Sequence, residues 1–76
     1  MENLRRLRLK KHMTQVALQM ETGIPQGALS KYERGAALPT ADNLAALAAY
    51  FHTSMDYLMG LTDEEKPYPP KRKNRP

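Results

Sequence analysis

The chain has 76 residues, the size of one small domain, and it contains no cysteine. Disulfide bonds and cysteine-ligated metal sites are therefore excluded, and the fold depends on a packed apolar core. The sequence shows no apolar run long enough to cross a membrane and no secretory signal, which predicts a soluble cytoplasmic protein without a membrane partner. The net charge of +4 favours a polyanionic partner, although the excess positive charge is spread along the whole chain.

The first predicted helix runs from Asn3 to about Lys11. Asn3 is a candidate N-cap, and the basic residues near Lys11 complement the negative pole of the helix dipole. Leu4, Leu7 and Arg8 follow the spacing of an inward-facing stripe. An arginine in such a stripe requires an acidic partner inside the fold.

Two short helices joined by a tight turn are predicted next. Thr14 is a candidate N-cap for a helix over 15–22, and Gly23 suits the left-handed conformation that ends a helix. Pro25 favours the first position of the following helix, which extends to about Arg34. A turn of about three or four residues between two helices is typical of a helix-turn-helix.

Two further helices are predicted after this pair. Apolar residues at helical spacing predict a helix from the cap Thr40 to Phe51, and Ser54 caps a short last helix. Strand signals are poor throughout. Residues 1–61 are therefore predicted to form an all-α domain of five helices, and 62–76 a disordered tail rich in Pro, Lys and Arg.

The third predicted helix has one apolar face and one polar face. Leu29 and Tyr32 are expected to point inward and to pack with Leu18 and Ile24. The opposite face carries side chains that suit a DNA edge, because glutamine can bond adenine twice, lysine bonds guanine O6 and N7, and serine bonds several bases. Its residues are Gln26, Gly27, Ser30, Lys31 and Arg34.

Separated blocks of the sequence resemble, in order, the phage-repressor and Cro family of helix-turn-helix regulators, the XRE type. The resemblance covers about residues 3–60 and implies a five-helix, lambda-repressor-like fold that binds double-stranded DNA in the major groove. The matching blocks are Met13–Gln15, Leu18, Thr22–Ile24, Ser30–Gly35, Leu38–Thr40 and Ser54–Gly60.

The resemblance also implies roles for single residues. Gln15 matches a glutamine that contacts a DNA phosphate and braces the first glutamine of the recognition helix, which here is Gln26 in a helix at about 25–34. Backbone contacts of this kind set the register on DNA without reading its sequence. The further positions that match base contacts are Gly27, Ser30 and Lys31, and those that match backbone contacts are Thr14 and Arg34.

Two positions depart from the family pattern. Gln19 stands where the family usually has an alanine against the recognition helix, and Pro25 replaces the usual serine or threonine cap. The family also pairs an arginine of its first helix with a glutamate near the end of the recognition helix. This implies a partly buried ion pair between Arg8 and Glu33, which would supply the partner that the inward arginine needs.

These features predict a sequence-specific transcriptional regulator, with repression as the first hypothesis. One recognition helix reads few base pairs, so a homodimer on a pseudo-palindromic operator is expected. The dimer surface is expected around the last helix, by analogy and from an apolar cluster. Its residues are Met55, Tyr57, Leu58, Met59 and Leu61.

Other interpretations remain open. The two central helices could form a hairpin that binds no nucleic acid, or the protein could be an antitoxin-like module that covers a protein partner with Val16, Met20 and the tail. The basic run 71–73 could add phosphate affinity or be inert. His12 and His52 are expected to end helices rather than bind metal. With no nucleophile–base pair, metal cluster or phosphate loop in the sequence, neither enzymatic activity nor a cofactor is expected.

Overall fold

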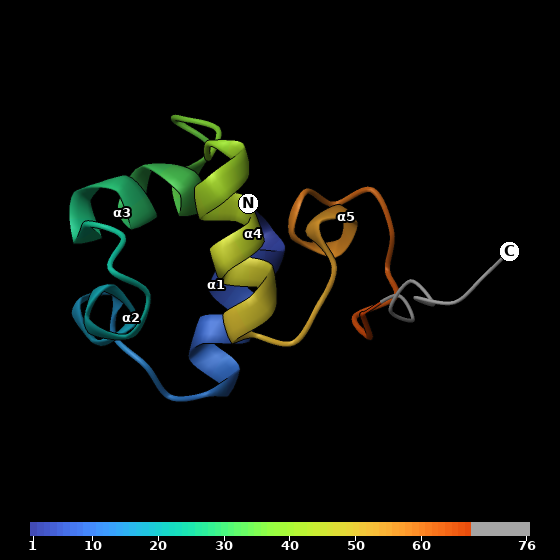
Figure 1. Ribbon diagram of the computed structural model, residues 1–76, viewed down its shortest axis with the longest axis horizontal. Helices are drawn as coiled ribbons and strands as arrows, with labels where there is room; N and C mark the ends of the chain where they lie inside the picture. The colour runs from blue at the N-terminus through green and yellow to red at the C-terminus, as the bar shows by residue number, and fades with distance from the viewer. Residues whose placement is uncertain (68–76) are drawn as a thin grey trace, which may run out of the picture.

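The computed structural model describes residues 1–67, and every regular element of this part is an α-helix. α2 and α3 lie together at one end of the molecule and α5 lies at the other (Figure 1). This architecture confirms the predicted all-α fold. The helices are α1 (Glu2–Lys10), α2 (Gln15–Thr22), α3 (Gln26–Arg34), α4 (Ala41–Tyr50) and α5 (Met55–Leu58).

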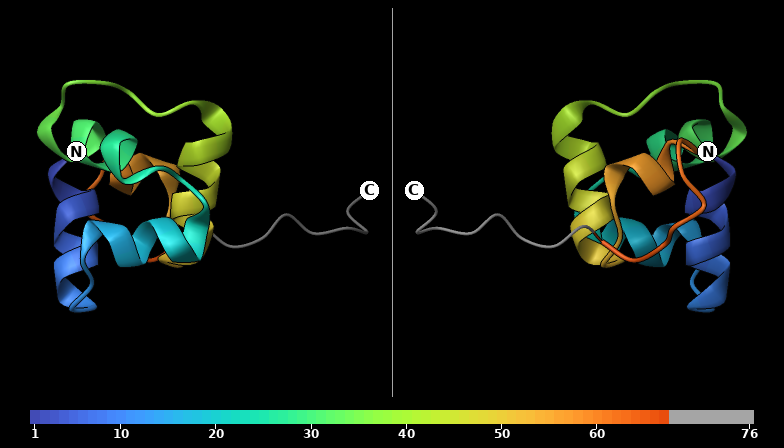
Figure 2. Two further views of the ribbon diagram at one scale, coloured as in Figure 1. Left: turned by 90° about the vertical axis from the view of Figure 1, so that its left-hand side faces the viewer. Right: turned by 90° about the vertical axis from the view of Figure 1, so that its right-hand side faces the viewer.

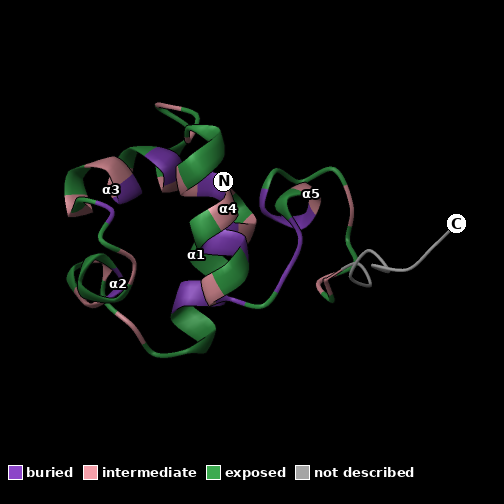
Figure 3. Ribbon diagram, in the orientation of Figure 1, coloured by how far each residue is buried: buried purple, intermediate pink, exposed green. Residues whose placement is uncertain are grey.

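The helices surround one apolar core. α1 and α4 overlap in Figure 1 but stand on opposite sides of the molecule in Figure 2. α5 packs on both α1 and α4. On the other side, α3 packs on α1 and α2, and α2 packs on α4. Buried positions face inward from every helix (Figure 3), and the core includes five leucines with no exposed surface: Leu4, Leu18, Leu29, Leu47 and Leu58.

Hydroxyl side chains cap three of the helices. Thr14, Thr40 and Ser54 each accept a hydrogen bond from the main-chain N–H three residues later, at 3.0–3.1 Å. These bonds satisfy N–H groups that have no partner within the helix. The caps expected for α2, α4 and α5 are therefore confirmed.

Left-handed residues end the helices. Gly23 and Gly35, which follow α2 and α3, have φ angles of 77° and 75°. His12 and His52 adopt the same region, at φ 57° and 54°, shortly after α1 and α4. Histidine enters this region more readily than most residues with a Cβ. The two histidines therefore occupy the helix ends where the sequence placed them.

Two predicted helix starts are wrong. α1 begins at Glu2, so Asn3 lies within the first turn, and its Nδ2 donates to the main-chain oxygen of Tyr57 at 2.8 Å. Asn3 therefore joins α1 to α5 instead of capping α1. Pro25 is the N-cap of α3 rather than its first helical residue, with φ −56° and ψ 141°. Because proline has no side-chain oxygen, the start of α3 needs an acceptor from elsewhere.

The chain after α5 stays close to the domain. The hydroxyl of Thr53 donates to the main-chain oxygen of Glu65, and Lys10 Nζ lies 3.1 Å from the Glu65 carboxylate. Contacts of the domain therefore extend beyond the predicted boundary at residue 61. The basic part of the tail, residues 71–75, lies outside the described residues. Within the described residues, no helix is long and apolar enough to cross a membrane.

Truncation of the core is expected to destabilise the protein strongly. Leu47 is completely buried in α4, whereas Leu38, in the loop before it, is 79% exposed. Leu47→Ala should lower the free energy of unfolding by about 2–5 kcal/mol, because it removes apolar contacts and leaves a cavity. Leu38→Ala is the matched control and should change it by less than about 0.5 kcal/mol. Urea denaturation followed by circular dichroism measures both, and equal losses would contradict the assigned core.

Candidate nucleic-acid interface

α2 and α3 are separated by residues 23–25 only. Gly23 supplies the positive φ angle that turns the chain, and Ile24 is 3% exposed, so the turn is anchored in the core. The Thr22 hydroxyl donates to the main-chain oxygen of Leu18 and accepts from the Ile24 N–H. The pair therefore forms the predicted helix-turn-helix.

The outward face of α3 is polar and carries positive charge. Gly27, Lys31 and Arg34 are exposed, and Gln26 and Ser30 are partly exposed. A Cβ at Gly27 would meet nothing within 4 Å, so this part of the helix surface is open to a close approach. Arg34 Nε lies 3.3 Å from the Ser30 hydroxyl. The structure therefore brings the predicted residues of α3 onto one surface.

The acidic residue of α3 points away from this surface. The Glu33 side chain is 4% exposed, and both its oxygens bond to Arg8, which is 11% exposed. Arg8 Nε donates to Oε2 at 2.7 Å and Nη2 donates to Oε1 at 2.9 Å. Arg8 Nη1 also donates to the main-chain oxygen of Met13 at 2.7 Å. The predicted Arg8–Glu33 ion pair is thus present, and it removes negative charge from the outward face.

The pair also determines the ionisation of both groups. Burial raises the pKa of Glu33, but hydrogen bonds from Arg8 and Gln15 and the charges of Arg8 and Arg5 outweigh it and leave the pKa below its ordinary value. The hydrogen bond to Glu33 raises the pKa of Arg8 against the opposing effect of burial. The carboxylate is therefore ionised at neutral pH, where it can only accept hydrogen bonds.

A chain of hydrogen bonds connects this carboxylate to the surface. Gln15 Nε2 donates to Glu33 Oε1 at 3.1 Å, and Gln26 Nε2 donates to Gln15 Oε1 at 2.6 Å. Because the carboxylate accepts only, Gln15 must turn its NH₂ group inward and its oxygen toward Gln26. Gln26 then keeps one N–H and its oxygen for an outside partner. This donor and acceptor together match the N7 and N6 edge of adenine.

One contact of this surface was not expected from the sequence. Gln19 Oε1 accepts a hydrogen bond from the main-chain N–H of Gln26 at 2.6 Å. The sequence identified Gln19 only as a bulky residue facing α3. The two departures from the family pattern could have indicated this contact, because Pro25 has no side-chain acceptor and Gln19 has one.

The expected dimer surface needs a correction. Tyr57 and Leu58 are 3% and 0% exposed, because the single turn of α5 packs this side on α1 and α4. They belong to the core and are unable to form an outer surface. Met55, Met59 and Leu61 remain exposed, at 44%, 46% and 71%.

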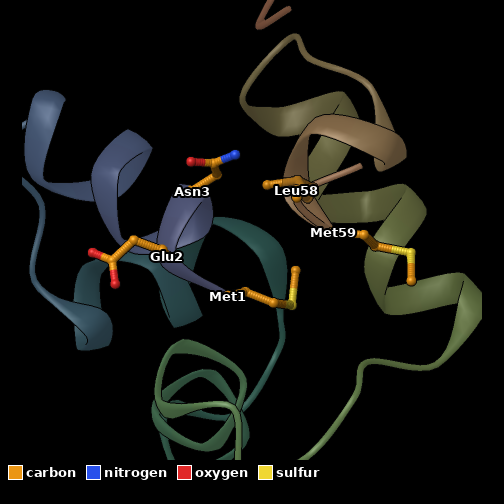
Figure 4. Close-up of a pocket in the computed structure, with 6 residues that line it drawn as sticks. Met1, Glu2, Asn3, Leu58 and Met59 are labelled. Carbon is orange, nitrogen blue, oxygen red and sulfur yellow. The ribbon is translucent and has the colours of Figure 1, made fainter. Parts of the chain in front are cut away.

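A small pocket is lined in part by Met59, one of these exposed residues. It is formed between the start of α1 and the end of α5, with Met1, Asn3, Leu58 and Met59 among its lining residues (Figure 4). Figure 4 shows the Glu2 carboxylate directed away from α5. The lining therefore consists mostly of thioether, aliphatic and amide groups, with Met59 at its exposed edge.

The fold and the outward polar face define a small helix-turn-helix domain. The family model described as helix-turn-helix matches residues 4–58. The chain is also 36% identical over 66 residues to YobD of Bacillus subtilis (strain 168), an uncharacterized HTH-type transcriptional regulator. That match covers 87% of this chain and 59% of YobD, so the chain spans less than two thirds of this relative. No solved structure matches. The chain therefore belongs to the XRE-type helix-turn-helix family.

Loss of the buried carboxylate is expected to destabilise the fold. Glu33→Ala should lower the free energy of unfolding at pH 7 by about 3–5 kcal/mol, because it leaves the Arg8 charge buried without a partner. Glu21→Ala, at an exposed position of α2, is the control and should cost less than about 0.5 kcal/mol. A loss under about 1 kcal/mol for Glu33→Ala would show that the pair is solvated, as surface pairs are.

The same pair gives the expected pH dependence. The pKa of Glu33 is lowered by folding, so its contribution to stability is present above the unfolded pKa and is lost as the pH falls through the folded pKa. Urea titrations between neutral and acidic pH should therefore show a smaller acid-induced loss of stability in Glu33→Ala than in the unmodified protein. Parallel profiles would contradict the lowered pKa.

Proposed function

We propose that this protein is a sequence-specific DNA-binding transcriptional regulator that places α3 in the major groove. The observation that carries the proposal is the hydrogen-bonded chain from Glu33 through Gln15 to Gln26. It holds a surface glutamine with one donor and one acceptor available to a partner. The description of YobD as a transcriptional regulator supports the same function.

The contacts divide into base readers and backbone contacts. Gln26 bonds an adenine through N6 and N7, and Lys31 bonds a guanine through O6 and N7. Ser30 and Gly27 lie against neighbouring bases, with the open surface at Gly27 allowing the helix to approach the groove floor. The phosphate contacts, which set register, come from Thr14, Gln15 and Arg34.

The active form is a homodimer on a pseudo-palindromic operator. One short helix reads too few base pairs for specificity, and two copies placed one DNA turn apart double the site. The dimer surface comprises Met55, Met59 and Leu61, which are exposed, and Met59 also lines the pocket between α1 and α5. Repression is the simplest regulatory outcome, because occupation of a promoter by this domain alone blocks other proteins.

A second candidate function is supported by the outer side of α2. Val16 and Met20, two apolar side chains of this helix, are 56% and 80% exposed. In an antitoxin-like module these two side chains would bind a protein partner, and DNA contact would be secondary. Two substitutions distinguish these functions. Gln26→Ala should abolish biological activity only if the protein acts by reading DNA, and Val16→Asp only if it acts by binding a protein partner.

Base reading is tested by selection from randomised duplex DNA. The unmodified protein should select two inverted half-sites with centres about 10 base pairs apart. Lys31→Ala should weaken binding by about 1–3 kcal/mol and lose discrimination at one base pair in each half-site. Lys66→Ala removes one positive charge from the segment after α5 and should leave discrimination unchanged. Equal weakening by Lys31→Ala on all sequences would assign Lys31 to a phosphate.

The dimer is tested by a charge at its surface. Met59→Glu should weaken binding to a complete operator by at least tenfold and leave binding to a single half-site nearly unchanged, because it affects only contact between copies (~1.4 kcal/mol or more). Leu9→Glu is the matched control, since Leu9 is also 46% exposed. Gel-shift titrations with one and two half-sites measure both. Equal effects of the two substitutions would contradict the assigned surface.

A further inference from the structure

The N-terminus of α3 lacks the side chain that usually closes such a helix. Its N-cap, Pro25, has the extended ψ angle of an N-cap but no side-chain acceptor, and its main-chain oxygen accepts from the N–H groups of Ala28 and Leu29 at 3.0 Å. By contrast, α2, α4 and α5 each begin with a hydroxyl that accepts such a bond. α3, the helix expected to enter the major groove, therefore begins without a side-chain cap from its own N-cap residue, as α1 does.

The first N–H of α3 finds its acceptor on the preceding helix, α2. Gln19 lies seven residues before Gln26, and its Oε1 accepts from the Gln26 main-chain N–H at 2.6 Å. This N–H is the first of α3, and no carbonyl within the helix is available to it. The hydroxyl caps of α2, α4 and α5 accept from the N–H three residues later, so Gln19 serves a different N–H from the one that a hydroxyl at position 25 would reach.

The same face of α2 holds Gln26 at a second point. Gln15 and Gln19 are four residues apart on one helix, so their side chains project from the same face. Gln15 bonds the side chain of Gln26, and Gln19 bonds its main chain. Gln26 is thereby attached to α2 at both ends, and its position relative to α2 depends on these two amides.

We propose that Gln19 is a positioning residue for DNA recognition, which caps α3 across the turn by accepting from its first N–H. This inference rests on the proposed function, because it assigns Gln19 a role in placing Gln26 against its base. The bond closes the helix start and holds the end of α3 at a set distance from α2. Without it, the first turn of α3 opens more often and Gln26 loses its orientation.

The cap itself is tested on the free protein, without DNA. Hydrogen exchange of the Gln26 amide, followed by NMR, should be about fivefold faster in Gln19→Met, which keeps the length of the side chain but removes the acceptor. Glu21→Met, at another exposed position of α2, is the matched control and should leave this amide unchanged. An unchanged Gln26 exchange rate in Gln19→Met would overturn the cap.

The role in recognition is tested on a duplex selected by the unmodified protein. Gln19→Met should weaken binding about fivefold and reduce discrimination at the base pair read by Gln26, which Gln26→Ala identifies. Gln19→Glu keeps an acceptor oxygen at the same side-chain length, so it should retain the discrimination that Gln19→Met loses, although its negative charge lowers affinity for all DNA sequences.

Two outcomes would overturn this role. One is an equal loss of discrimination in Gln19→Glu and Gln19→Met, since the acceptor oxygen would then have no part in placing Gln26. The other is a uniform loss of affinity in Gln19→Met with discrimination retained, which is the result of lower stability alone. A protein that selects no DNA sequence would refute the proposed function, whereas the exchange experiment would still decide whether Gln19 caps α3.

Discussion

The structure depends on the burial of one positive charge. Arg8 lies on the inward stripe of α1, and an isolated charge in that position would be strongly destabilising. Each of its three guanidinium nitrogens donates one hydrogen bond, two to Glu33 and one to the main-chain oxygen of Met13. These bonds join α1 to α3 and to the loop before α2. The relative orientation of the first three helices therefore follows from the need to neutralise a single side chain.

The consequence at the surface follows from the chemistry of the carboxylate. An ionised carboxylate has no proton to donate, so Gln15 has only one orientation in which it can bond both Glu33 and Gln26. The direction of the amide groups is transmitted from the core to the outward face of α3. A buried ion pair, which contributes little net stability by itself, can in this way specify the donor and acceptor pattern that a surface residue presents.

The start of α3 shows how a local rule can be met by a distant residue. A proline at the N-cap restricts the chain before the helix but leaves the first N–H without a partner. The side-chain oxygen of Gln19, on α2, accepts from this N–H, so the bond depends on how the two helices pack. In this protein the turn, the cap and the orientation of Gln26 are parts of one arrangement of α2 and α3.

The sequence by itself determined the features that follow from local rules. The three hydroxyl caps, the left-handed helix ends and the inward rows of leucines depend on neighbouring residues, and each was predicted. The faces of α5 were not predictable in this way, because four residues make barely one turn and show no periodicity. Tyr57 and Leu58 were therefore assigned to the surface. The bonds of Asn3 to α5 and of Gln19 to Gln26 cross between helices. Such contacts exist only once the helices are packed, and for that reason only the tertiary structure decided them.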